Sequence, residues 1–589
     1  MRLIPTPQSV CLSDGVCDPS LVYLATVSSS CPAWLRVQYA SCLNENGTIP
    51  LTLSCGDDTR NEAYNMTVSS DGVTVQADGP RGAFYALQTW RQLATQGTVP
   101  CCAIADKPDL PFRGFYQDVS RGRIPTLDTL KVLVDRLSAW KINSLQLYVE
   151  HTHRFREYVG IHDDLGYYTD EDISELDAYC RERCIELIPS LSSFGHLYFL
   201  LQSPRYRHLC EMENYTPSIH NWHERLIHHT IDPNNPESFA LITSLIAQYL
   251  PLFSSNYFNI CCDETFDLCK GRNAGGDTTA CYATFVSRLA AFLRERGKTT
   301  MMWGDIVMQH PETLDTLPED IVFLNWCYDA RGNGLRAEFL EENGRPQIVC
   351  PSVHSHKRFV EKIEYSAPNL QNVTRSGLEH GAKGMLITNW GDYGHLCFDE
   401  GILYGTALGA SVAWNVHGTE ETAFEEALAA LVYGDAEVIA ILRELNRSDE
   451  LFLESFGYEK ALWELTVQFF DNERGVPKDY DRHKADLQKL DLQEKERACA
   501  ACAARLQELT NTGTIDRRIG ETLTLAARGI AVVFGALHAA SRDLPYDAAW
   551  IDACKAWLAE YKALWFARNQ AGEWQRIETF FLKNILGES

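Results

Sequence analysis

Residues 257–272 read YFNICCDETFDLCKGR, and this stretch sets the interpretation of the whole chain. An aromatic and apolar run ends abruptly in two adjacent carboxylates, Asp263 and Glu264, which are followed by a glycine-containing loop. An apolar run that ends in acids is typical of a buried parallel strand whose carboxyl end lies at the mouth of a barrel. A single Asp-Glu pair is more often a strand ending in solvated acids, so the other strand ends decide between the two readings.

The composition is that of an acidic globular protein. The chain has 589 residues, of which 45% are apolar and 22% charged, so it is too long for one core and is not a disordered chain. Its net charge of −26 opposes binding to nucleic acid or to anionic membranes. A neutral or cationic small substrate fits this charge better.

Targeting signals and metal-binding patterns are weak. No run approaches the roughly 18 apolar residues of a spanning helix, and residues 1–10 lack the apolar core of a secretory signal, so we expect a cytoplasmic protein. Most of the 20 cysteines fall inside predicted strands and helices, which favours reduced thiols that pack as small hydrophobes. Cys499 with Cys502, and His151 with His153, lack a second ligand pair at zinc spacing, so no metal site is predicted.

Three regions differ in their periodicity. Residues 1–108 alternate strand-like runs with one amphipathic helix that starts near Arg81, which predicts a small α+β domain. Residues 109–420 contain eight β segments that alternate with helical segments, which predicts a (β/α)8 TIM barrel. An open doubly wound sheet is the alternative, but no glycine-rich dinucleotide loop follows the first strand.

The last region, residues 421–589, loses the β signal and is rich in Ala, Leu, Glu and Arg. This composition predicts an all-helical domain. The helices would pack on the barrel or on a second subunit, so a homodimer is an open alternative.

Barrel enzymes carry their chemistry at the carboxyl ends of the strands. Tryptophans there suit the apolar face of a pyranose ring, while carboxylates and an arginine suit its hydroxyl groups. A lone tryptophan is more often core than sugar platform, but several at the strand ends of one barrel favour a sugar site. The candidate site residues are an arginine at the first strand and residues at the later strand ends. They are Arg113, Glu150, His196, Asp263, Glu264, Trp303, Trp326, Tyr328, Trp390 and Asp392.

Five segments carry a resemblance to a known family. They read LIPTPQSV (3–10), RGAFYALQTWRQL (81–93), RGFYQDVSRGRIP (113–125), FNICCDETFDL (258–268) and ITNWGDYGH (387–395). Together they resemble family 20 glycoside hydrolases, the exo-acting β-N-acetylhexosaminidases. The resemblance covers the first two regions, and the helical tail is similar to that of a bacterial branch of the family.

The resemblance implies a retaining hydrolase that has no enzymic nucleophile. Glu264 would protonate the glycosidic oxygen and later activate water, while the substrate's own 2-acetamido oxygen attacks the anomeric carbon to form an oxazoline-like intermediate. Asp263 would stay ionised and hold the acetamide N–H. His196, with Glu150 behind it, would support the acid; the alternative for His196 is a ring satisfied by local backbone.

The same resemblance assigns the sugar-binding residues. Arg113 matches the arginine that grips hydroxyl groups, although a salt bridge in the barrel floor is the alternative. Trp390 and Asp392 match a Trp-x-acid pattern at the last strand. Many members bond the acetamide carbonyl with a tyrosine from the seventh strand, but that strand here offers histidines, so Tyr328 or Tyr393 would take this role.

We therefore predict an exo-β-N-acetylhexosaminidase that releases terminal β-linked GlcNAc, with GalNAc as an open second substrate. No cofactor, nucleic-acid partner or membrane partner is implied. Two alternatives remain: a barrel glycosidase of other specificity with a carboxylate nucleophile, and a non-catalytic glycan-binding protein.

Overall fold

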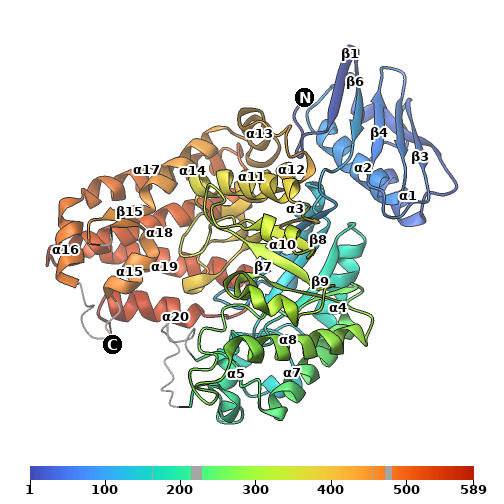
Figure 1. Ribbon diagram of the computed structural model, residues 1–589. Helices are drawn as coiled ribbons and strands as arrows, with labels where there is room; N and C mark the ends of the chain where they lie inside the picture. Colours follow the sequence, from blue (N-terminus) through green and yellow to red (C-terminus); the bar gives the residue numbers. More distant parts are fainter. Residues whose placement is uncertain (162, 214–227, 456, 471–479, 589) are drawn as a thin grey trace.

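The structure is a computed structural model, and it describes residues 1–161, 163–213, 228–455, 457–470 and 480–588. Figure 1 shows the N-terminal domain in blue and the helical tail in orange to red on different sides of a central barrel. This arrangement confirms the predicted order of an α+β domain, a TIM barrel and a helical region.

The N-terminal domain is a mixed six-stranded sheet in the order β1-β6-β4-β5-β3-β2. Residues along β3, β4 and β5 alternate between buried and exposed, as expected where one sheet face is covered and the other meets solvent. The elements are β1 (Ser9–Cys17), β2 (Val22–Val27), α1 (Ala33–Ala40), β3 (Ile49–Cys55), β4 (Tyr64–Val68), β5 (Val73–Ala77), α2 (Pro80–Ala94) and β6 (Val99–Asp106).

The barrel closes where β14 pairs with β7, and all of its strands are parallel. Every residue of β8 is buried, because a barrel strand packs against side chains inside and against helices outside. The strands are β7 (Phe112–Asp118), β8 (Ser144–Val149), β9 (Glu186–Leu191), β10 (Tyr257–Asn259), β11 (Thr299–Trp303), β12 (Val322–Trp326), β13 (Gln347–Cys350) and β14 (Gly384–Asn389).

Helices follow the strands on the outside of the barrel. They are α3 (Leu127–Ala139), α4 (Asp170–Arg181), α5 (Tyr198–Leu201), α7 (Pro236–Tyr249), α8 (Thr278–Arg294), α9 (Asp305–Gln309), α10 (Ala337–Glu342), α11 (Ile363–Glu379) and α12 (Leu403–Trp414). Thr126 caps α3 by accepting from the backbone N–H of Thr129.

The helical tail contains one feature that the sequence did not predict. A short antiparallel hairpin, β15 (Glu450–Leu453) with β16 (Tyr458–Ala461), interrupts the helices. The helices are α13 (Glu421–Leu428), α14 (Glu437–Ser448), α15 (Leu462–Phe470), α16 (Tyr480–Lys489), α17 (Leu492–Asn511), α18 (Arg517–Ser541), α19 (Ala548–Arg568) and α20 (Trp574–Thr579).

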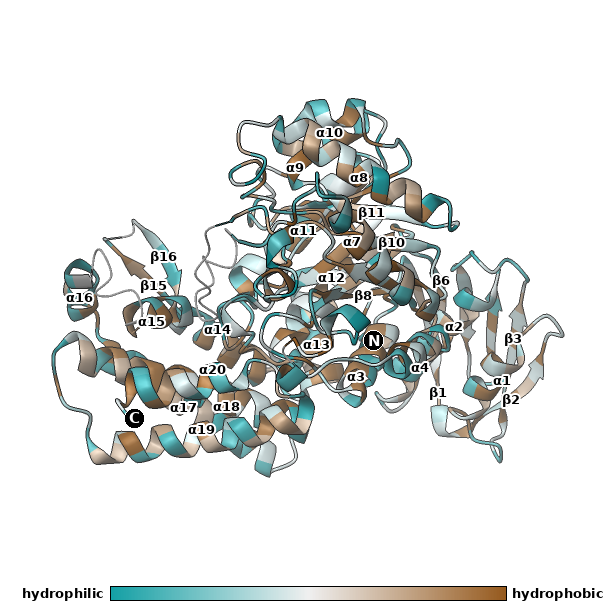
Figure 2. Cartoon of the chain, turned by 90° about the horizontal axis from the view of Figure 1, so that it is seen from below, coloured by the Kyte–Doolittle hydropathy of each residue, from teal (hydrophilic) through white to brown (hydrophobic). Residues whose placement is uncertain are grey.

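Helix α18 is the core helix of the tail. Among the described residues it is the one helix long and apolar enough to cross a membrane, but 83% of its most apolar window is buried inside the protein. Figure 2 shows α17, α18 and α19 lying beside one another, with hydrophobic residues along their lengths. Burial between neighbouring helices therefore accounts for its apolar composition.

The tail holds the loops that follow the last barrel strands. Arg358, in the loop after β13, pairs with Glu450 of the hairpin at 2.8 Å. Trp463 of α15 donates through Nε1 to the backbone carbonyl of Tyr393, after β14, at 2.9 Å. Because these loops lie at the carboxyl ends of the strands, the tail supports the face of the barrel where the predicted site lies.

Candidate active site

Asp263 and Glu264 lie just beyond β10, and a single imidazole nitrogen joins them. The Nε2 atom of His196 is 3.3 Å from Asp263 Oδ2 and 3.4 Å from Glu264 Oε2. The Glu264 side chain is 33% exposed and that of Asp263 only 11%. One acid therefore faces an incoming ligand while its neighbour is enclosed beside the histidine.

The strand that carries these acids is shorter than predicted. The strand ends at Asn259, although Cys261 O still accepts from the backbone N–H of Trp303 at 3.0 Å. The backbone of Cys261, Cys262 and Glu264 then adopts positive φ angles of 58°, 62° and 48°. Residues with a Cβ rarely adopt this left-handed conformation, and it often marks a functional site. The chain thus turns sharply at the point where it presents the acids.

Arg121, which the sequence analysis missed, organises the other side of the site. Its guanidinium reaches Glu150 at 3.1 Å and Asp392 at 3.0 Å. It also lies 3.1 Å from Nδ1 of His196 and donates to the hydroxyl of Tyr148 at 3.0 Å. Glu150 therefore supports His196 through Arg121, which stands between them.

The hydrogen bonds of Arg121 define the protonation of His196. Because a guanidinium can only donate, Nδ1 of His196 accepts, and the ring carries its proton on Nε2, toward the two carboxylates. Burial and the Arg121 charge act to lower the pKa of His196, whereas Asp263 and Glu264 act to raise it by favouring a proton on Nε2. The Nε2 atom thus lies close to both Asp263 and Glu264.

Asp263 and Glu150 stay ionised although they are buried. Burial acts to raise the pKa of Asp263, but His196 and then Arg121 oppose it, and the pKa is lowered overall. Burial likewise acts to raise the pKa of Glu150, and Arg121 together with His196 lowers it. Asp263 Oδ1 is buried and has no hydrogen-bond partner among the described residues, so it can accept from a ligand.

Arg113 does not belong to this site, which corrects the prediction for that residue. It is the second residue of β7, at the amino end of the barrel, and its side chain is fully buried. The guanidinium pairs with Glu62 of the N-terminal domain at 2.7 Å and stacks over Trp414 at 4.9 Å. Arg113 is the salt bridge in the barrel floor that the sequence left as the alternative.

An aromatic wall lines the barrel interior beside the acids. The ring of Trp303 lies 5.0 Å from that of Tyr116 and 5.5 Å from that of Trp390. Trp390 also contacts Tyr148 at 5.3 Å. The tyrosines Tyr116 and Tyr148 point inward from β7 and β8, and sequence reasoning missed them because single aromatic residues inside strands resemble core.

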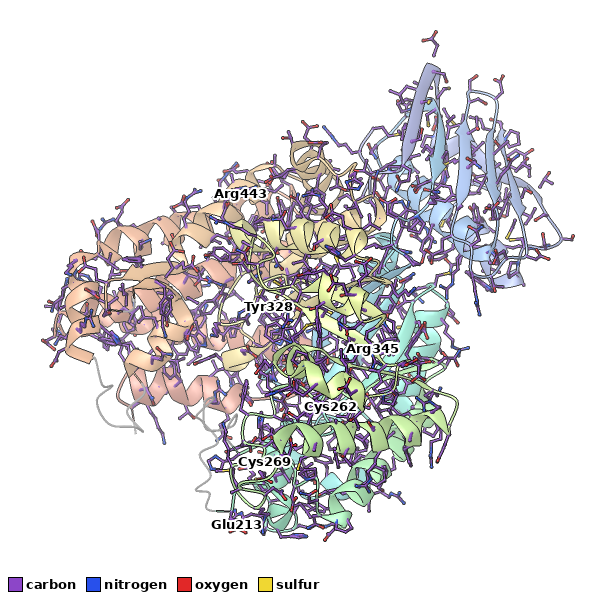
Figure 3. The ribbon with its side chains drawn as sticks, viewed as in Figure 1. Glu213, Cys262, Cys269, Tyr328, Arg345 and Arg443 are labelled. Carbon is purple, nitrogen blue, oxygen red and sulfur yellow. The ribbon has the colours of Figure 1, made fainter. Side chains whose placement is uncertain are left out.

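Tyr328, labelled in Figure 3, extends this wall on the side of β12. Its hydroxyl oxygen accepts from Nε1 of Trp390 at 2.6 Å, and its ring stacks on that of the half-buried Trp326 at 5.1 Å. Tyr393 lies elsewhere: the Nζ of Lys357 lies 5.2 Å over its ring, and its carbonyl binds the tail. The structure therefore brings Tyr328, rather than Tyr393, to the tryptophans.

His196, Asp263 and Glu264 also satisfy a simple test for a metal site. One ligand atom of each lies within 4.8 Å of the others, and no other such group occurs in the described part of the chain. The guanidinium of Arg121 already occupies Nδ1 of the same histidine. That fixed positive charge disfavours a cation at this position.

Comparisons with known proteins match both the N-terminal domain and the barrel to one family. The profile of the glycosyl hydrolase family 20 catalytic domain matches residues 110–355, and the profile of domain 2 of the same family matches residues 1–107. A beta-hexosaminidase of Akkermansia muciniphila is 28% identical over 287 residues, which cover 42% of this chain and 57% of that protein. Beta-hexosaminidase subunit A1 of Dictyostelium discoideum is 25% identical over 303 residues, which cover 46% of this chain and 55% of that protein.

The chain thus spans little more than half the length of these curated relatives. A chitobiase of Flavobacterium johnsoniae superposes with a TM-score of 0.60 at 18% identity, over 94% of this chain and 95% of that one. At that identity the likeness concerns the fold, and it extends to the helical tail.

Proposed function

The chain belongs to glycosyl hydrolase family 20, and on that premise we propose that it is an exo-β-N-acetylhexosaminidase. The observation that carries the proposal is the shared contact of His196 Nε2 with two carboxylates, one enclosed and one facing outward. This arrangement suits a reaction in which one acid transfers protons and the other remains ionised beside the reacting group.

The proposed reaction has two steps. In the first, Glu264 protonates the glycosidic oxygen as the bond from the anomeric carbon to that oxygen breaks, and the acetamide carbonyl oxygen bonds to the same carbon. In the second, Glu264 takes a proton from water, which attacks the anomeric carbon and reopens the ring to an acetamide. The ionised Asp263 accepts from the acetamide N–H and offsets the positive charge that develops there.

Sugar recognition is assigned to the residues around Arg121. Arg121 and Asp392, which pair at 3.0 Å at the mouth of the site, offer a donor and an acceptor to ring hydroxyls. Trp303, Trp326 and Trp390 enclose the acetamido side. The Tyr328 oxygen accepts from Trp390, so the hydroxyl can donate its own hydrogen to the acetamide carbonyl.

The test compares two substrates that differ only at C2: an aryl β-N-acetylglucosaminide and the matching aryl β-glucoside. Strong preference for the acetamido sugar is expected, because only that substrate supplies the nucleophile. Equal rates would contradict the proposal and favour a carboxylate nucleophile on the protein, while binding without turnover would favour a glycan-binding protein. Adding the aryl β-N-acetylgalactosaminide to the series decides between GlcNAc and GalNAc.

A further inference from the structure

The backbone around the acids is held by residues that do not face the ligand. Glu264 has φ +48° and His196 has φ +57°, both in the left-handed region. Residues other than glycine rarely adopt this conformation, and they keep it where surrounding contacts hold them. The contacts that hold Glu264 are therefore part of how its carboxylate is aimed.

His229 is one of these contacts, and its ring binds two backbone groups at once. Its Nδ1 accepts from the backbone N–H of His196 at 3.1 Å, so this nitrogen carries no proton. The proton therefore sits on Nε2, which donates to the backbone carbonyl of Glu264 at 2.9 Å. Burial lowers the pKa of His229 to about 4, which keeps the ring neutral and this tautomer populated at neutral pH.

Asp267 fixes the segment that carries His229. Its Oδ2 accepts from the backbone N–H groups of His229 and Thr230, each at 3.2 Å, and its Oδ1 accepts from the Thr230 hydroxyl. Asp267 belongs to the same loop as Glu264. The loop that bears the acid thus also anchors the histidine that restrains it.

Asp305 restrains the other side of the same residue. It is the first residue of α9, just beyond Trp303, and its Oδ2 accepts from the backbone N–H of Glu264 at 3.0 Å. The N–H and the C=O of Glu264 are therefore bound by two separate side chains, and the same C=O also accepts from the backbone N–H of Phe266 at 2.6 Å. Together these contacts fix the direction of the Cα–Cβ bond of Glu264.

We propose that His229 and Asp305 are positioning residues for the general acid: they clamp the backbone of Glu264 in its left-handed conformation and so aim its carboxylate at the leaving group. Through its other ring nitrogen, Nδ1, His229 also binds the backbone N–H of His196. This inference rests on the proposed function, because it assumes that Glu264 donates a proton. The side-chain hydrogen bonds of this clamp to Glu264 end on backbone atoms, so no residue pattern in the sequence indicated it.

The experiment exploits the leaving group. A dinitrophenyl aglycone departs without protonation, whereas a phenyl aglycone needs the acid, so a misaimed Glu264 lowers kcat/KM for the phenyl substrate selectively. Measured on both N-acetylglucosaminides, His229→Asn should lower kcat/KM by about 10²-fold for phenyl and by less than about threefold for dinitrophenyl. Asparagine keeps an acceptor near the Nδ1 position and loses the donor to Glu264.

Three further substitutions locate the effect. His229→Gln places an amide N–H near the Nε2 position, so it should retain most of the phenyl activity that His229→Asn loses. Asp305→Ala removes the acceptor for the Glu264 N–H and should show the same selective loss, whereas Asp305→Asn keeps an acceptor and should show little. If His229→Asn fails to fold, the Asp305 pair still decides.

His153 provides the matched control. It is a buried histidine that pairs with Asp170 at 3.2 Å, outside the clamp, so His153→Asn should affect both substrates equally. Equal losses for His229→Asn and Asp305→Ala would overturn the clamp. Failure of the proposed function would give a different result. The wild type would turn over neither substrate, or Glu264→Gln would leave the ratio of kcat/KM for the phenyl and dinitrophenyl substrates unchanged.

Discussion

Trp390 donates its indole N–H to the hydroxyl oxygen of Tyr328 at 2.6 Å, and this bond joins the ends of β14 and β12 across the candidate site. The bond orients the tyrosine hydroxyl, which also contacts the Thr388 side chain. It is the geometric reason to assign the acetamide carbonyl to Tyr328.

Tyr328→Phe is therefore expected to lower kcat by about 10²-fold, because the acetamide carbonyl oxygen loses the hydrogen bond that holds it in position to attack the anomeric carbon. Tyr393→Phe should have a much smaller effect, because Tyr393 lies under Lys357 and its carbonyl binds the tail. Steady-state kinetics on an aryl N-acetylglucosaminide measure both. A larger loss in the Tyr393 variant would reverse the assignment.

The two acids should respond differently to neutral replacement. Glu264→Gln should lower turnover by roughly 10²- to 10⁴-fold, because proton transfer is lost. Asp263→Asn should lower kcat more than it raises KM, because the charge that Asp263 opposes develops mainly in the transition state. Normal turnover by Asp263→Asn would exclude substrate-assisted catalysis for this protein.

Arg113 at the start of β7 and Arg121 just beyond its carboxyl end should separate function from stability. Arg121→Lys should raise KM and lower kcat, because a single ammonium cannot reach Glu150, Asp392 and His196 together. Its thermal stability should change less than its activity.

Arg113→Leu should do the opposite. It leaves the Glu62 carboxylate buried without its partner, which is expected to cost about 3–5 kcal/mol of unfolding free energy. Chemical denaturation measures this loss, and kcat/KM of the folded fraction should stay close to the wild-type value. A selective loss of sugar binding in this variant would return Arg113 to the site.

Glu361 predicts one part of the pH dependence of stability. Burial raises the pKa of its carboxyl to about 8, although backbone N–H groups, including that of Gly405, oppose the shift. The folded state therefore keeps a proton that the unfolded chain releases near its ordinary value of 4.5, so stability falls as pH rises from 4.5 to about 8. Glu361→Gln should match the wild type at about pH 4 and exceed its melting temperature at about pH 9.

Glu400 predicts the opposite sign. Burial acts to raise its pKa, but Arg136, Arg568 and Arg518 lower it to about 2. Its stabilising contribution is thus present above 4.5 and is lost as pH falls toward 2. Glu400→Gln should lower the melting temperature at about pH 7 and should converge on the wild type at about pH 2, which differential scanning calorimetry can follow.

Local patterns in the sequence were enough to predict the architecture. Alternating β and helical periodicities over residues 109–420 indicated the barrel, because buried parallel strands and amphipathic helices each leave a pattern within a few residues. The same reasoning placed Asp263 and Glu264 at a strand end beside His196. This reasoning did not predict the hairpin of the tail, because each strand of the hairpin spans only four residues.

The sequence by itself thus determined the fold class, the acids and the tryptophans, since each depends on residue type and local spacing. Only the tertiary structure decided which arginine serves the site, because Arg113 and Arg121 lie in one segment but at opposite ends of β7. Only the tertiary structure revealed the clamp on Glu264, because His229 and Asp305 bind its backbone across the fold. Contacts with backbone atoms do not depend on the identity of the residue they bind, and so they leave no signature in the sequence.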